Sequence, residues 1–109
     1  MKINFQSILG KHILIGITLL NENQEIIDKF QFHGIIEYAK KDEMIGVRSN
    51  TKIDKYPVIK DENGLYILPP DLNAINTAVN GIYTLHSTGE KVENPDLVAS
   101  WTITTPKIH

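Results

Sequence analysis

Apolar and polar side chains alternate along most of this chain, and this alternation predicts β-strands. In the stretch from about Glu25 to Tyr38, one parity is apolar and the other polar: the first holds Phe30, Phe32, Gly34, Ile36 and Tyr38, and the second holds Lys29, Gln31, His33 and Glu37. Such a period of two is typical of a strand with one buried and one exposed face. Gly34, in the middle, predicts a bulge or a sharp bend in this strand.

Residues 12–20 are almost all apolar, which predicts a central strand buried on both faces. Shorter strands are expected at 44–48, 53–59, 65–68, 82–87 and 97–104. Because Pro57 cannot donate to a β-ladder, the strand at 53–59 is expected at a sheet edge. Asn63-Gly64 predicts a tight hairpin turn, and Thr88-Gly89 predicts a second turn.

One short helix is expected between these strands, over residues 71–80. Pro69-Pro70 interrupts the preceding strand, and the Asp71 side chain can cap the first helical turn. Leu72, Ile75 and Val79 have the spacing of one helix face. The resulting fold class is mainly β: a strongly bent antiparallel sheet or small open barrel of 6–7 strands, with this helix at one end.

The composition suits one cytoplasmic domain that spans residues 1–109. The chain is 41% hydrophobic and 22% charged, which is ordinary for a globular protein. It has no cysteine, which favours a reducing compartment. The apolar run 13–20 is too short to cross a bilayer as a helix and is not followed by a signal-peptide cleavage site, so we expect no membrane association.

Charge is unevenly distributed between the two halves of the chain. Residues 1–60 carry nine basic and seven acidic side chains, a balance of +2, whereas residues 61–109 carry two basic and six acidic side chains, a balance of −4. The chain is not basic enough to predict nucleic-acid binding. An acidic half fits a basic protein partner better, although charge blocks are also common on plain solvated surface.

Motifs that carry chemistry are missing from the sequence. It has no phosphate-binding glycine loop, no His-Glu-x-x-His and no EF-hand pattern, so neither a cofactor nor a metal ion is expected. His33 and His86 each lie within a predicted strand, with Glu37 and Glu90 a few residues away, and a small enzyme using these histidines is one alternative. The other is that both simply occupy polar strand faces. Trp101 lies on the apolar parity of its strand and is expected in the core.

A small, cysteine-free, mildly acidic domain that is rich in Ile, Lys and Asn resembles in type the immunity proteins of bacterial toxin systems, such as contact-dependent growth inhibition. The segments Leu68-Pro69-Pro70-Asp71-Leu72 and Thr88 to Asp96 contribute to this resemblance. It implies a non-enzymatic protein that neutralises a cognate toxin, for example a nuclease, by direct binding. It does not fix the fold and assigns no residue roles, because these families have many unrelated folds.

The charge pattern supplies a candidate surface for such a partner. We expect an acidic face made by the hairpin turn at Asp61 and Glu62 and by the loop that carries Glu90, Glu93 and Asp96. Carboxylates in these turns would pair with the basic cleft of a nuclease toxin. A third function class is a module that binds a small ligand or a carbohydrate at the mouth of the barrel.

Overall fold

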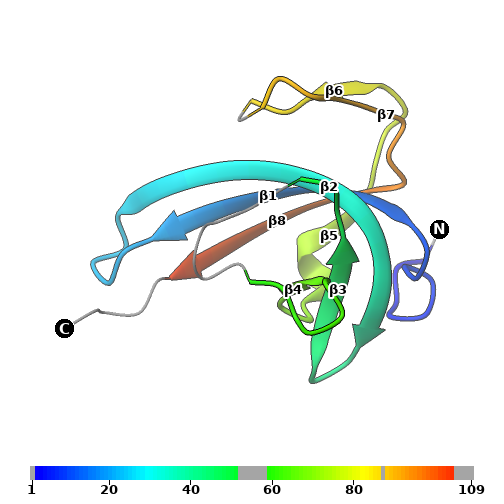
Figure 1. Cartoon of the computed structure of the whole chain (residues 1–109), viewed down its shortest axis with the longest axis horizontal. Coiled ribbons are helices and arrows are strands. Elements are labelled where there is room, and N and C mark those ends of the chain that lie inside the picture. The colour runs from blue at the N-terminus through cyan, green and yellow to red at the C-terminus, as the bar shows by residue number, and fades with distance from the viewer. Residues whose placement is uncertain (1, 52–58, 87, 105–109) are drawn as a thin grey trace.

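The computed structural model describes residues 2–51, 59–86 and 88–104, and these residues form a mainly β fold (Figure 1). The elements, in chain order, are β1 (His12–Leu20), β2 (Ile26–Lys40), β3 (Met44–Arg48), β4 (Tyr66–Leu68), the 3-10 turn η1 (Leu72–Ala74), β5 (Ile75–Thr77), β6 (Ile82–Thr84), β7 (Lys91–Glu93) and β8 (Leu97–Thr104). The predicted fold class is confirmed in the form of an open, bent sheet.

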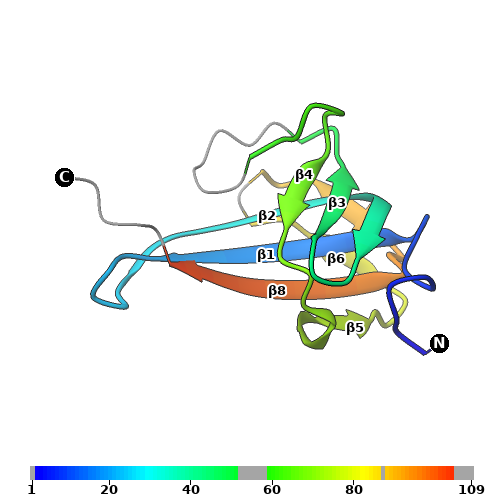
Figure 2. The same cartoon turned by 90° about the horizontal axis from the view of Figure 1, so that it is seen from below.

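Six strands form the main sheet in the order β4-β3-β2-β1-β8-β5, and β6 with β7 forms a separate two-stranded sheet. β1 is central and pairs with β2 on one side and β8 on the other (Figure 2). The β1–β8 pair is parallel, while the other strand pairs are antiparallel. A mainly antiparallel sheet was predicted and is confirmed, while the one parallel pair, β1 with β8, was not foreseen.

β2 is the long curved strand that bends the sheet (Figure 1). The register of β2 against β3 shifts between Ile36 and Tyr38, which makes Glu37 the bulged residue. A bulge or a sharp bend was predicted at Gly34, but the bulge lies at Glu37 and the β1–β2 register is regular at Gly34. A Cβ atom at Gly34 would lie 2.3 Å from the Arg48 carbonyl oxygen, so this position needs glycine because another backbone approaches closely.

The apolar side chains of the alternating strands point to the concave face of the bent sheet and form the core there. Its buried side chains include Ile13, Ile15, Ile17, Phe32, Ile36, Ile45, Tyr66, Leu97 and Trp101. Trp101 is therefore a core residue, as predicted. The N-terminal segment closes part of this face, since Ile8 is fully buried in the same cluster.

The run 13–20 lies in β1, and the described ranges contain no helix with the length and hydropathy of a membrane span.

The helix predicted over 71–80 is mostly wrong. Asp71 does act as a cap, because its side chain accepts a hydrogen bond from the Asn73 N–H, but the helical part ends after the single turn η1. Ile75 is extended and pairs with Ala99 of β8. Three β-branched residues, Ile75, Thr77 and Val79, disfavour a helix here, and the β8 edge offers Ile75 a buried position instead.

The predicted hairpin around Asn63-Gly64 is confirmed. Gly64 has a positive φ of 79°, and Lys60 forms a β-bridge with Tyr66. The Asp61 side chain holds the turn by accepting from the N–H groups of Asn63 and Leu65. Most of the strand predicted at 53–59 lies outside the described residues.

The β6–β7 hairpin lies across the convex face of the main sheet (Figure 1). It turns through Gly89, at a positive φ of 76°, where a turn was predicted. A second apolar cluster attaches it to the sheet: Leu85 and Val92 of the hairpin segment pack with Leu14 of β1, and Tyr83 and Val98 flank them. The hairpin covers only part of this face.

Candidate functional site

Three side chains form a hydrogen-bonded series where the hairpin meets the convex face. His12 of β1 and His33 of β2 are diagonal neighbours, because His12 pairs with Ile35 and Leu14 with His33. His12 Nε2 lies 2.9 Å from His33 Nδ1, and His33 Nε2 lies 2.9 Å from Oε2 of Glu90. We call Glu90, His33 and His12 the clasp, since they join the hairpin to the sheet.

The chemistry of the clasp fixes the positions of its protons when both imidazoles are neutral. The Glu90 carboxylate only accepts, so His33 Nε2 carries the proton and donates it to Glu90. His33 Nδ1 is then an acceptor, and His12 Nε2 donates to it. This leaves a lone pair on Nδ1 of His12. A carboxylate that orients an imidazole is an arrangement also used in acid–base catalysis.

Asp96 anchors the backbone of His12. The Asp96 carboxylate accepts from the His12 N–H at 2.9 Å, and the Asp96 N–H donates to the His12 carbonyl at 2.9 Å. Burial lowers the pKa of His12, and the neighbouring His33 lowers it further, while the negative charge of Asp96 acts in the opposite direction. His12 is thereby held toward its neutral form.

A hollow of about 320 Å³ lies beside the clasp. We call it the end hollow; its lining includes His12, His33, Ile35, Arg48, Ser49 and Asn50. Arg48 bonds to the Glu37 carboxylate and donates to the Asn63 carbonyl at 3.3 Å, and the hydrogen bond and charge of Glu37 raise the pKa of Arg48. The Ser49 hydroxyl donates to the His33 carbonyl at 2.5 Å. The Arg48 guanidinium and the Ser49 hydroxyl therefore already have partners within the fold.

The five predicted acidic residues are divided between structural and exposed positions. Asp61 holds its own turn, whereas Glu90 and Asp96 bond to the two clasp histidines. Glu62 is exposed in the 61–64 turn, and Glu93 is exposed on β7. The segment from Glu90 to Asp96 was predicted as a loop, but its middle residues form β7 because they pair with β6.

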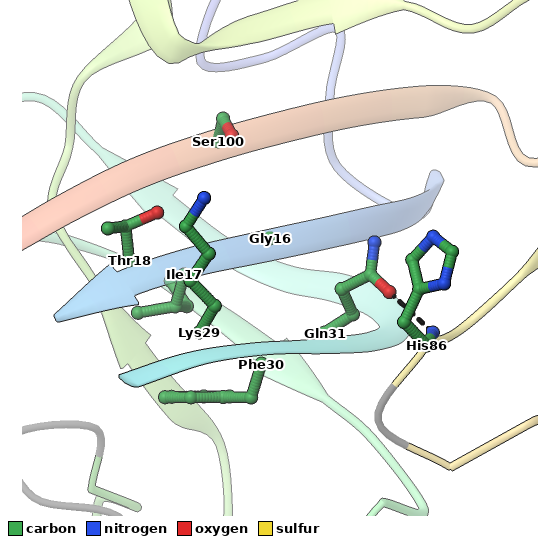
Figure 3. Close-up of a pocket in the computed structure, with 8 residues that line it drawn as sticks. All are labelled: Gly16, Ile17, Thr18, Lys29, Phe30, Gln31, His86 and Ser100. Atoms are coloured by element: carbon green, nitrogen blue, oxygen red, sulfur yellow. Dashed lines mark hydrogen bonds between the residues drawn. The ribbon is translucent and has the colours of Figure 1, made fainter. Parts of the chain in front are cut away.

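The histidines predicted as an alternative site have different partners from those expected. Glu37 bonds to Arg48 rather than to His33, and Glu90 bonds to His33 rather than to His86. His86 donates its backbone N–H to the Gln31 side chain at 2.8 Å and lines a separate hollow on the convex face (Figure 3). His12, which the sequence did not single out, is the actual neighbour of His33.

No group of three or more metal-ligating His, Asp or Glu side chains occurs in the described part of the chain. Comparison with known proteins matches no family, no curated relative and no solved structure. The site is therefore interpreted from its own geometry.

Proposed function

We propose that this chain is a non-enzymatic binding protein that neutralises a basic protein partner, as an immunity protein neutralises a toxin. The observation that carries the proposal is the β6–β7 hairpin, a separate two-stranded sheet held across the domain with one face toward solvent. The clasp and the Leu85–Val92 cluster immobilise it. A preorganised surface loses less conformational entropy when a partner binds.

The outer face of the hairpin combines apolar and acidic side chains. Ile82 of β6 is 65% exposed and is paired across the hairpin with Glu93 of β7. Val79, just before β6, is 78% exposed. Protein interfaces commonly place apolar anchors at the centre and charged groups around them. Ile82 and Val79 would be the anchors, and Glu93 the acidic group beside them.

A basic partner is favoured by the charge of the second half of the chain, which is −4. Nuclease toxins are basic at their clefts because they bind phosphates. Exposed carboxylates such as Glu62 and Glu93 would speed the encounter with such a cleft and disfavour acidic partners. Glu90 and Asp96 would contribute less directly, because they already hold the clasp.

The test is whether a neighbouring gene encodes a secreted protein with a toxic C-terminal domain, and whether this chain binds that domain. We expect tight association that slows as salt rises. Ile82→Ser should weaken binding about tenfold or more, and Glu93→Gln should mainly slow association. Glu22→Gln, in the β1–β2 turn, is the matched charge control. Unchanged affinity and salt dependence in a variant with Ile82, Glu62 and Glu93 all replaced would contradict the proposal.

The clasp supports a second candidate, a small enzyme in which His12 acts as the base. Its Nδ1 lone pair and the Arg48 guanidinium belong to residues that line the same end hollow. This candidate predicts turnover of an anionic substrate, tested with an RNA oligonucleotide and a phosphate monoester. His12→Gln, which can keep the hydrogen bond to His33 through its Nε2, should abolish that turnover while the fold persists. Turnover that is absent, or unaffected by this variant, would reject the candidate.

A further inference from the structure

The uncovered part of the convex face contains a hollow that results from one glycine in the central strand. In the register of the sheet, Gly16 of β1 lies between Gln31 of β2 and Ser100 of β8. The next position on the same face, Thr18, lies beside Lys29 of β2. Because Gly16 has no side chain, the middle of this row is empty. A hollow of about 410 Å³ opens there, and we call it the convex-face hollow.

The polar side chains around Gly16 project to the same side of the sheet (Figure 3). Lys29, Gln31 and Thr18 rise from their strands, while Phe30 points to the opposite face (Figure 3). His86 closes one end, and its backbone N–H binds the Gln31 side-chain oxygen at 2.8 Å. This bond identifies the side-chain oxygen of Gln31 as an acceptor from the hairpin segment.

The chemistry of the lining favours an anion. The described lining residues include one charged side chain, the Lys29 ammonium, and no carboxylate. Their other polar groups include the hydroxyls of Thr18 and Ser100 and the His86 imidazole, all of which can donate. Glu90, on the same hairpin, is bonded to His33. A carbohydrate site would be expected to offer a Phe, Tyr or Trp surface, and the one such ring in the described lining, that of Phe30, is turned away.

We propose that the convex-face hollow binds a small anion with a carboxylate or phosphate group. Lys29 supplies the charge, and the Thr18 and Ser100 hydroxyls supply hydrogen bonds over the floor at Gly16. This site is independent of the proposed partner surface, because it lies on the main sheet and involves neither Ile82 nor Glu93. Either function can fail without the other.

The test is a titration of the protein followed by ¹H–¹⁵N NMR, with inorganic phosphate and with acetate, against sodium chloride at equal ionic strength. Shifts that saturate should be confined to amides around Gly16, Gln31 and Ser100. Phosphate and acetate are separate arms, so the tighter of the two identifies the anion class. Glucose is the uncharged probe.

Two variants examine the lining. Gly16→Val fills the hollow, and the fold should tolerate it because a Cβ at Gly16 lies 3.7 Å from the Ser100 Oγ, an ordinary contact. Binding should then disappear. Lys29→Gln should weaken binding about tenfold, whereas the exposed Lys41→Gln in the β2–β3 turn should leave it unchanged.

Three results would overturn the proposal. The first is phosphate and acetate shifts no different from those with chloride. The second is anion binding that survives Gly16→Val in a protein whose remaining spectrum is native. The third is saturable binding of glucose without binding of either anion, which would assign the hollow to a carbohydrate instead.

Discussion

His33 Nε2 lies 2.9 Å from Oε2 of Glu90, although the two residues are 57 positions apart in the chain. This contact joins the long curved strand β2 to the turn of the β6–β7 hairpin. Together with the 2.9 Å bond from His12 to His33, it makes His33 the middle member of a series between two sheets. The position of the hairpin therefore depends on polar as well as apolar contacts.

Removing the middle member of the clasp should destabilise the domain more than removing the charge at its end. His33→Ala deletes both hydrogen bonds and should lower the free energy of unfolding by about 1–2 kcal/mol. Glu90→Gln keeps an acceptor, and because the Glu90 side chain is 46% exposed, the loss should be only about 0–1 kcal/mol. Urea denaturation measures both. Glu93→Gln on the outer face is the control, and a loss there as large as in His33→Ala would show that the clasp does not stabilise the hairpin.

Stability should fall on mild acidification because the fold lowers the pKa of His12. The unfolded chain protonates this histidine from about pH 6.5 downward, whereas the folded chain protonates it only at lower pH. Within that interval the unfolded state binds more protons, so the free energy of unfolding decreases as the pH falls. The stability that comes from the neutral His12 is fully present above the pKa of this histidine in the unfolded chain. It is lost as the pH falls through the lower pKa of His12 in the folded chain.

Urea denaturation at several pH values between neutrality and pH ~5 measures how steeply the free energy of unfolding falls with pH. Most carboxylates titrate below this range. His12→Gln should flatten this slope, because glutamine does not titrate. His86→Gln, at an exposed histidine, should retain it. An unchanged slope in His12→Gln would assign the pH dependence to other groups.

The strand pattern could be predicted because burial in a sheet follows local parity. Phe32 and Ile36 are fully buried, while Ile35 between them is 41% exposed, as alternation requires. The turns at 63–64 and 88–89 could be predicted from their glycines, because the conformation of a turn depends on its own few residues. Parity does not specify strand direction, and the parallel pairing of β1 with β8 could not be derived from it.

The clasp could be predicted only in part. Counting back along both strands from the Asn21–Gln24 turn would have placed His12 near His33, and this signal was missed. Glu90 could not have been assigned to His33, because that contact depends on how a hairpin from the far end of the chain lies on the sheet. The helix error at 71–80 has the same origin: Ile75 is buried by the edge of β8 rather than by helix packing.

The buried apolar side chains that attach the hairpin to the sheet should contribute more to the free energy of unfolding than its exposed apolar side chains do. Leu85 is fully buried against Leu14 and Val92, so Leu85→Ala should cost about 2–3 kcal/mol of unfolding free energy. Ile82→Ala, three residues earlier and 65% exposed, should change it by less than about 0.5 kcal/mol. Chemical denaturation of both proteins makes the comparison. Similar losses in the two variants would mean that the outer face of the hairpin is not free.

Two glycines in neighbouring strands should respond oppositely to alanine. At Gly34 of β2, a Cβ would lie 2.3 Å from the Arg48 carbonyl oxygen and 2.9 Å from its carbon, so β2 and the end of β3 must separate. Overpacking of this kind costs about 1–3 kcal/mol, and backbone atoms cannot move aside as a flexible side chain can. Gly34→Ala should therefore be clearly destabilised in urea.

At Gly16 of β1, the atoms that a Cβ would meet are the Ser100 Oγ at 3.7 Å and the Ala99 carbonyl oxygen at 4.0 Å, both ordinary contacts. Alanine also restricts the unfolded chain more than glycine does, which stabilises a compatible position by about 0.4–1 kcal/mol. Gly16→Ala should thus be neutral or slightly stabilised in the same denaturation experiment. Equal destabilisation of Gly16→Ala and Gly34→Ala would contradict this explanation. The loss of stability would then come from replacing any glycine in the sheet, and not from the close approach of Arg48 to Gly34.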